Sequence, residues 1–292
     1  MGQSNAALDP SALLDVAVEA ARAGADVVAA AAPRVRTIEW RTKAQADFVS
    51  EVDLASEAAI VAVIRARAPG ASVLAEEGGA HEPAAAAPGA AGGGSAAGVV
   101  DRRAGVVEAT GVRFVVDPLD GTTNFLHGYP EYAVSIGVLH GAELVAGVVI
   151  DVALGETFTA TRGGGAFANG LPLRVSAIGD TARALIGTGF PFTREGDVDP
   201  YVGQLARVMR GAAGIRRAGA AALDLAAVAA GRFEAFWETM LSPWDIAAGI
   251  LLVREAGGVV TDLAGAPCAV KKTGVVAGNP ALHAWLLSQL ST

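Results

Sequence analysis

The chain of 292 residues contains little cysteine, few basic residues and no long apolar run. Cys268 is the single cysteine, so no internal disulfide can form, and this fits a reducing compartment. No stretch of about 18 or more strongly apolar residues is free of charge, which predicts no membrane-spanning helix. No Lys or Arg precedes Arg22, so the charged first segment of a signal peptide is missing. We therefore expect a cytoplasmic protein that does not bind membranes.

The scarcity of positive charge also narrows the range of partners. The chain has 22 Lys and Arg against 30 Asp and Glu, which gives a formal net charge of −8. Broad electrostatic binding of nucleic acid requires a basic stripe, so we do not expect nucleic acid among the partners. A phosphorylated substrate remains compatible with this charge, because bound cations can reverse the local field of an acidic pocket.

The composition is that of a folded protein with a sizeable core. Hydrophobic residues make up 52% of the chain and charged residues 18%. The length suffices for one large domain or two closely joined lobes. We expect an α+β lobe over residues 1–183 and an α/β lobe over residues 184–292, with a cleft between them. The Ala-, Gly- and Pro-rich stretch at about residues 80–111 is expected to be a flexible surface excursion.

Capping signals and hydrophobic spacing place the elements. Helices are predicted over residues 10–32, 53–68, 200–210, 220–230, 243–256 and from 280 onward. Strands are predicted over residues 72–75, 112–116, 184–189, 232–237, 259–261 and 275–277, with successive strands between 132 and 161. The run Arg-Gly-Gly-Gly at residues 162–165 looks like a phosphate-binding loop. No strand-to-helix context supports that interpretation, so a turn is the better one.

The most informative segment is DPLDGTTNF at residues 117–125. Its two carboxylates lie three residues apart, after a hydrophobic strand and before a turn of small residues. Hard cations such as Mg²⁺ prefer oxygen ligands and commonly share their site with a substrate phosphate. A bend stiffened by Pro118 can direct Asp117, the Leu119 carbonyl and Asp120 at one point. Gly121 lets the backbone approach a ligand, and a helix that begins near Thr122 would face a phosphate with its free N–H groups.

Three further acidic positions are candidates to converge on that segment: Asp53, the pair Glu76-Glu77, and Asp245. Each has a structural alternative. Asp53 could only cap its helix, Glu76-Glu77 could be a solvated strand end, and Asp245 could serve only a capping box with Ser242. A binding module stabilised by Ca²⁺ or Mg²⁺ is another alternative for the whole set.

Taken together, these motifs resemble those of the inositol monophosphatase family of Mg²⁺-dependent, lithium-sensitive phosphatases. Two motifs are specific in combination: residues 117–125 (DPLDGTTNF) and residues 244–249 (WDIAAG). Around them stand residues 47–53 (DFVSEVD), 76–79 (EEGG) and 255–258 (EAGG). The likeness extends from about residue 12 to residue 288, without the excursion after His81.

The resemblance implies an α/β fold in the form of a layered αβαβα sandwich, with two or three Mg²⁺ per subunit. Glu76, Asp117 and the Leu119 carbonyl would hold the first ion, and Asp117, Asp120 and Asp245 the second. A third ion near Glu76 is expected at high magnesium. The catalytic set would be Glu76 with a hydrogen-bonded Asp53–Thr122 pair that orients and deprotonates the attacking water.

The same resemblance assigns the substrate residues. Gly121 and Thr122 would present N–H groups to the phosphate, while Asp120, Ala221 and Glu238 would contact the alcohol. Ala220 stands where the family usually has Ser or Thr, so one hydroxyl is missing. Lys43 matches a lysine near the site, and for His127 we favour a structural role in its loop. A homodimer is also implied.

The expected activity is hydrolysis of inositol monophosphate or a related small polyol or sugar phosphate by metal-activated water. Alternatives within the family are phosphatases for histidinol phosphate, fructose 1,6-bisphosphate and adenosine 3′,5′-bisphosphate. Thr123 favours the inositol branch, because relatives acting on nucleotide or histidinol phosphates commonly carry Lys there. A non-enzymatic regulatory or RNA-associated role is an alternative from a different class.

Overall fold

The computed structural model describes residues 9–44, 47–83, 107, 109–192 and 198–291. Most of the excursion expected at about residues 80–111 lies outside this part of the chain. Its beginning is described, and Gly79–His81 forms the short strand β4. No helix in these described ranges is long and apolar enough to cross a membrane.

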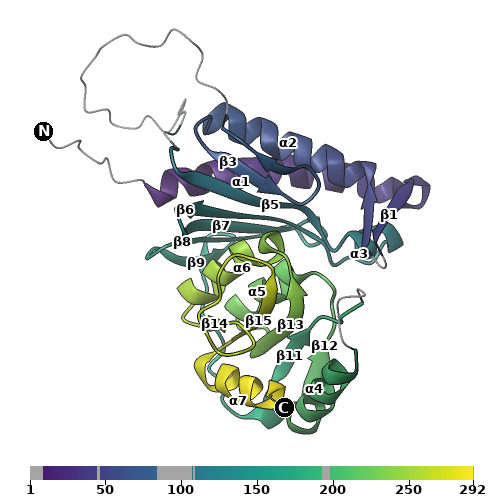
Figure 1. Cartoon of the computed structure of the whole chain (residues 1–292), viewed down its shortest axis with the longest axis vertical. Helices are drawn as coiled ribbons and strands as arrows, with labels where there is room; N and C mark the ends of the chain where they lie inside the picture. The colour runs from purple at the N-terminus through teal and green to yellow at the C-terminus, as the bar shows by residue number, and fades with distance from the viewer. Residues whose placement is uncertain (1–8, 45–46, 84–106, 108, 193–197, 292) are drawn as a thin grey trace, which may run out of the picture.

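The elements stack in alternating helical and sheet layers, as Figure 1 shows. Two long helices cover one face of an eight-stranded sheet, two more lie between that sheet and a five-stranded one, and the last two cover the outer face of the smaller sheet. The first pair is α1 (Pro10–Ala31) and α2 (Glu51–Arg67), and the middle pair is α5 (Ala221–Ala229) and α6 (Pro243–Glu255). The outer pair is α4 (Val198–Gly211) and α7 (Pro280–Leu290). This is the layered αβαβα arrangement expected from the sequence.

The larger sheet has the strand order β10-β9-β8-β7-β6-β5-β3-β4. Strand β3 runs parallel to β5, and every other pair is antiparallel. The strands besides β4 are β3 (Ser72–Ala75), β5 (Val112–Asp120), β6 (Ala133–His140), β7 (Glu143–Asp151), β8 (Glu156–Thr161), β9 (Gly165–Ala168) and β10 (Leu171–Pro172). Strand β5 continues four residues past the predicted end, so both Asp117 and Asp120 lie within it.

The smaller sheet has the order β12-β11-β13-β15-β14. Its strands are β11 (Leu185–Thr188), β12 (Gly214–Arg216), β13 (Ala235–Leu241), β14 (Val259–Thr261) and β15 (Thr273–Gly278). The strand predicted from residue 232 begins at Ala235 instead. The reason lies in the end of α5, where the N–H groups of Arg232 and Phe233 both donate to the Ala227 carbonyl. These two residues complete the helix end and cannot join the sheet.

Small elements complete the site region: the hairpin of β1 (Trp40–Ala44) and β2 (Asp47–Ser50), and the short helix α3 (Thr122–His127). The hairpin was not predicted. Helix α2 begins two residues before the predicted start because Ser50 is its N-cap. The Ser50 hydroxyl accepts from the Val52 N–H at 3.1 Å, and the Asp53 carboxylate accepts from the Ser50 N–H at 2.9 Å.

The Gly-rich run at residues 162–165 is the turn between β8 and β9, as predicted. The N–H groups of Gly163 and Gly165 donate to the Glu255 carboxylate at 2.9 and 3.0 Å. These amides already have an anionic partner within the protein, which agrees with the choice of a turn over a phosphate loop.

Close packing of small residues keeps the layers near one another. A Cβ on Gly137 of β6 would lie 2.4 Å from the Ala247 Cβ of α6, and one on Gly24 of α1 would lie 2.7 Å from the Ser56 hydroxyl of α2. Glycine is therefore needed at both positions. The approach of α2 to α1 and of α6 to the sheet brings the N-terminal ends of α2 and α6 to the edge where β3 and β5 end.

Candidate active site

Four carboxylates from distant parts of the sequence converge at that edge. Glu76 follows β3, Asp117 and Asp120 belong to β5, and Asp245 lies in the first turn of α6. Since Ala75 pairs with Val116 across the parallel strands, Glu76 stands beside Asp117. The Glu76 N–H donates to the Val116 carbonyl at 3.2 Å. Asp117 is only 2% exposed, so these charges meet in a largely buried space.

Burial and mutual repulsion both disfavour ionisation of this cluster. Burial raises the pKa of Asp117 well above its usual value, and the nearby charges of Glu76, Asp120 and Asp245 raise it further. Burial raises the pKa of Glu76 to about 7, although Lys43 acts in the opposite direction. Burial raises the pKa of Asp120 to about 6 against the effect of backbone N–H donors. The cluster therefore requires a positive charge to be ionised near neutral pH.

Backbone N–H groups fix the orientation of three of these carboxylates. Asp117 accepts from the Leu119 N–H at 3.1 Å, Asp120 from the Ala222 N–H at 2.8 Å, and Asp245 from the Ser242 N–H at 2.7 Å. The last bond belongs to the capping box of α6. The capping role of Asp245 and its place in the cluster are thus compatible, and so are those of Asp53 in α2.

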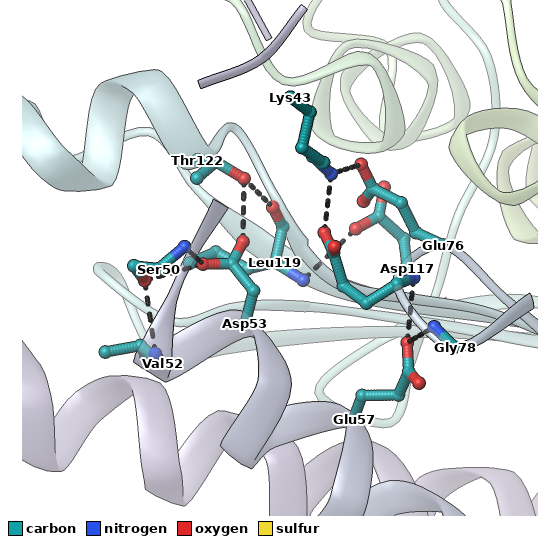
Figure 2. A network of polar contacts seen from close by, with 11 residues as sticks. Lys43, Ser50, Val52, Asp53, Glu57, Glu76, Gly78, Asp117, Leu119 and Thr122 are labelled. Atoms are coloured by element: carbon teal, nitrogen blue, oxygen red, sulfur yellow. Dashed lines mark hydrogen bonds and ion pairs between the residues drawn. The ribbon is translucent and has the colours of Figure 1, made fainter. Parts of the chain in front are cut away.

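Lys43 supplies a positive charge at the edge of the cluster (Figure 2). Its ammonium nitrogen lies 2.9 Å from Glu76 Oε1 and 2.6 Å from Glu77 Oε1. The hairpin that was not predicted is the element that delivers this lysine from β1 to the end of β3.

Asp53 and Thr122 are joined beside the cluster, as Figure 2 shows. The Thr122 hydroxyl lies 3.0 Å from Asp53 Oδ1 and 2.9 Å from the Leu119 carbonyl, so two acceptors share one donor. Gly121 precedes α3 with φ of 84°, in the left-handed region that favours glycine. A Cβ at this position would lie 2.7 Å from the Glu131 carbonyl.

The donor set suits a hard divalent cation. Carboxylate and carbonyl oxygens are the ligands that Mg²⁺ prefers, and buried carboxylates of like charge gain most from a cation. Among the described residues, however, no three carboxylate, imidazole or thiolate groups lie close enough together to hold an ion as they stand. Binding would require the side chains to turn toward a common point, which their repulsion opposes until a cation is present.

Two adjoining cavities open beside the cluster. The larger, of about 360 Å³, is lined by Phe48, Glu76, Gly121, Thr122, Thr123, Phe192, Arg217 and Gly219. The smaller, of about 170 Å³, is lined by Asp120, Gly189, Arg217, Gly219, Ala221, Glu238, Met240, Leu241 and Asp245. The three predicted substrate residues Asp120, Ala221 and Glu238 therefore share one cavity. Burial raises the pKa of Glu238 to about 7, with Arg217 acting against the shift.

Sequence reasoning missed residues that support this region. Arg217 lines both cavities, with its guanidinium 4.9 Å from the Phe192 ring centre. Glu57 and Ser56 of α2 are buried next to Asp53. A sequence signal for Ser56 and Glu57 exists, because they lie three and four residues after Asp53 and so share its helix face. His127 lies at the exposed end of α3, where its ring contacts Trp40, in agreement with the structural role favoured for it.

Comparison with known proteins decides the family. The model of the inositol monophosphatase family matches residues 9–292. The chain belongs to this family. It is 42% identical to the Nus factor SuhB of Pseudomonas aeruginosa over 280 residues, which cover 95% of each chain. It is 41% identical to an inositol-1-monophosphatase of Mesorhizobium japonicum over 277 residues, again 95% of each. The solved structure of the extragenic suppressor protein suhB from Bartonella henselae has a TM-score of 0.84 and 38% identity, covering 96% of this chain and 99% of that one.

Family membership confirms the resemblance seen in the motifs and the αβαβα fold. It indicates a phosphatase of the inositol monophosphatase family, whose members generally depend on Mg²⁺. The relatives carry two kinds of name, one enzymatic and one of a Nus factor. The comparisons therefore give no support to the expectation that nucleic acid is absent from the partners of this protein.

The raised pKa values predict how stability depends on pH. The folded values of about 7 for Glu76, about 6 for Asp120 and about 7 for Glu238 exceed the ordinary 4.5, 3.8 and 4.5. Each group contributes stability that is complete below its ordinary value and is lost as pH rises through its folded value. Without metal, the melting temperature should therefore fall between about pH 5 and about pH 8. Mg²⁺ should raise it more at the higher pH.

Thermal melts in EDTA and in excess Mg²⁺ measure this effect, with Glu238→Gln as the matched variant. Glu238→Gln removes one of the groups with a raised pKa and should show a smaller loss with pH. If Mg²⁺ raised the melting temperature equally at about pH 5 and about pH 8, the electrostatic description would be contradicted.

Proposed function

We propose that this protein hydrolyses the phosphate monoester of a small polyol or sugar, inositol monophosphate being the first candidate, with Mg²⁺ and water. The observation that carries the proposal is the meeting of Glu76, Asp117, Asp120 and Asp245 beside the Asp53–Thr122 hydrogen bond. A structural metal site would have no need of such a pair, since its ligands alone would serve.

The residues that would hold the cations follow from the family and from the donor set. Glu76, Asp117 and the Leu119 carbonyl would hold one Mg²⁺, and Asp117, Asp120 and Asp245 a second, with a third near Glu76 at high concentration. When bound, such ions supply a more acidic water and stabilise charge on the entering and leaving oxygens.

The chain's own residues would position the attacking water and take its proton. Thr122 Oγ1, held by Asp53 and the Leu119 carbonyl, can accept a hydrogen bond from a water while the threonine hydroxyl donates its own hydrogen bond to Asp53. This arrangement orients the attacking water and gives its proton a route to the Asp53 carboxylate. The N–H groups of Gly121 and Thr122, at the start of α3, would face the phosphate oxygens. No covalent phosphoenzyme is required.

The smaller cavity would receive the alcohol. Glu238 and Asp120 can accept hydrogen bonds from substrate hydroxyls there, with Ala221 forming part of the wall. Gly189 leaves room for the Glu238 side chain, because a Cβ on Gly189 would lie 1.9 Å from the Glu238 Cδ. Histidinol phosphate, fructose 1,6-bisphosphate and adenosine 3′,5′-bisphosphate are the competing substrates within the family.

A homodimer, inhibition by lithium and a cytoplasmic location complete the proposal and rest on the family likeness alone. We also keep the two lobes, residues 1–183 and 184–292, as a proposal. Under it, Ala221, Glu238 and Asp245 would come from the second lobe and the other site residues from the first. Light scattering, inhibition assays with LiCl and expression of each lobe separately measure these points.

Replacing one acidic residue should abolish activity without loss of the fold. Asp120→Asn or Asp245→Asn removes a charge from the proposed second cation site, and we expect Mg²⁺-dependent turnover to fall by more than the ~10–100-fold that replacing an outer partner of a metal ligand costs. Phosphate release from inositol, sugar, histidinol and nucleotide phosphates, with Mg²⁺ and with EDTA, measures this and ranks the substrates. Glu255→Gln, at the far end of α6 where the carboxylate accepts from the β8–β9 turn, is the matched control. Near-normal turnover of both Asp variants would refute the site.

A second role is favoured by the name of one relative, the Nus factor SuhB that is 42% identical. We propose that a surface of this protein serves a regulatory complex independently of hydrolysis. If so, wild-type protein and Asp245→Asn should capture the same partner from an extract of the source cell, with nuclease treatment showing whether RNA is needed. Failure of both baits to retain any specific partner would count against this role.

A further inference from the structure

One face of helix α2 contacts the turn after Glu76, the end of β5 and Thr122 at the start of α3. Ser56 and Glu57 lie three and four residues after Asp53, so both side chains share a helix face with it. This face is buried, with Ser56 fully buried and Glu57 only 7% exposed. Asp53 already belongs to the proposed catalytic pair, whereas the other two have no role in the proposed chemistry.

Glu57 fixes the turn that follows β3, as Figure 2 shows. Its Oε2 accepts from the N–H of Glu77 at 2.9 Å and from that of Gly78 at 3.1 Å. Two consecutive backbone donors on one carboxylate oxygen hold the turn directly after Glu76. The other side of the turn is held by the Glu76 N–H, which donates to the Val116 carbonyl of β5. The backbone that carries Glu76 is therefore fixed from both the sheet and the helix.

The sequence around this contact is adapted to it. A Cβ on Gly78 would lie 2.4 Å from Glu57 Oε1 and 2.7 Å from His81 Nε2, so only glycine admits the carboxylate at this distance. His81 Nε2 lies 3.7 Å from Glu57 Oε1 and is itself buried. A buried carboxylate with backbone donors is costly to remove, because those N–H groups would lose their partner.

Ser56 makes the corresponding contact with the second segment. Its hydroxyl donates to the Pro118 carbonyl at 2.8 Å, between Asp117 and Leu119. Along the helix, Asp53 and Glu57 are about 6 Å apart, at 1.5 Å per residue. The helix thus spaces Thr122, Pro118 and the turn after Glu76 along one rigid element. Gly24 of α1 makes room for this face, since a Cβ there would lie 2.7 Å from the Ser56 hydroxyl.

We propose that Glu57, supported by Ser56, is a positioning residue that sets the Glu76–Glu77 turn for cation binding. This inference rests on the proposed function, because the ion it serves is the Mg²⁺ of that proposal. Groups that orient metal ligands in this way commonly affect metal affinity or activity by ~10–100-fold when replaced.

Glu57→Gln tests the inference with little change of shape. The amide keeps one acceptor oxygen but loses the charge, so the hold on the turn weakens. We expect the Mg²⁺ concentration for half-maximal activity to rise ~10-fold, with most of kcat regained at saturating Mg²⁺. Calorimetric titration with Mg²⁺ alone, without substrate, should show the same loss of affinity. Hydrogen exchange should become faster at the Glu77 and Gly78 amides.

Two further variants sharpen the result. Gly78→Ala attacks the same contact from the other side and should reproduce the shift in Mg²⁺ requirement. Glu51→Gln is the matched control on the same helix, because Glu51 is exposed and pairs with Arg34 at the surface, at 3.1 Å. This control should leave the Mg²⁺ affinity and the exchange of both amides unchanged.

The outcomes separate this inference from the proposed function. Suppose that the wild-type protein is active and that Glu57→Gln has the same Mg²⁺ requirement, even if the variant melts at a lower temperature. This result would overturn the inference and leave the proposed function standing. Wild-type protein that neither binds Mg²⁺ nor hydrolyses any ester of the panel would overturn both.

Discussion

The repulsion among carboxylates buried in one place is the constraint around which this molecule is organised. Removing a charge from water costs several kcal/mol even after relaxation, and like charges add to that cost. The protein offsets part of it with backbone N–H donors, at Leu119, Ala222 and Ser242, and with the Lys43 ammonium. What remains is a site whose ionised state requires further positive charge, and a divalent cation with a phosphorylated substrate is the chemistry that this arrangement suits.

The scaffold keeps these groups in place through close contacts between layers. Glycines at positions 24 and 137 let α1 meet α2 and α6 meet the larger sheet at distances that a side chain would forbid. The alanine-rich composition has the same consequence, because small side chains allow helices to lie near their neighbours. Short capping boxes then give Asp53 and Asp245 two duties each, at a helix start and in the site.

Much of this could be predicted from the sequence, because its signals are local. Pro10, Pro243 and Pro280 mark helix starts, and the motif at residues 117–125 predicts a helix start near Thr122, although β5 runs four residues past its predicted end. The convergence of Glu76, Asp117, Asp120 and Asp245 was predicted through family motifs, since no local rule brings residues so distant together. Hairpin β1–β2 was missed, because its short strands are marked by no turn signal beyond polar residues. The start of β13 was misplaced because the backbone bonds to Ala227 that complete α5 are a tertiary outcome.

The roles of Glu57 and Ser56 lay beyond sequence reasoning for a related reason. Their spacing from Asp53 places them on one face of α2, but only the folded chain shows that this face meets the turn after β3 and the Pro118 carbonyl. The acidic cluster and helix α2 thus pack as one unit, in which sequence motifs identify the proposed ion ligands and packing identifies the residues that contact their backbone.

The most direct test of this account is anomalous diffraction from crystals of the protein soaked in Mn²⁺, which binds to oxygen ligands as Mg²⁺ does and scatters anomalously. The account predicts strong anomalous peaks within coordination distance of Asp117, flanked by Glu76 on one side and by Asp120 and Asp245 on the other. Well-ordered carboxylates with no anomalous peak between them would contradict it.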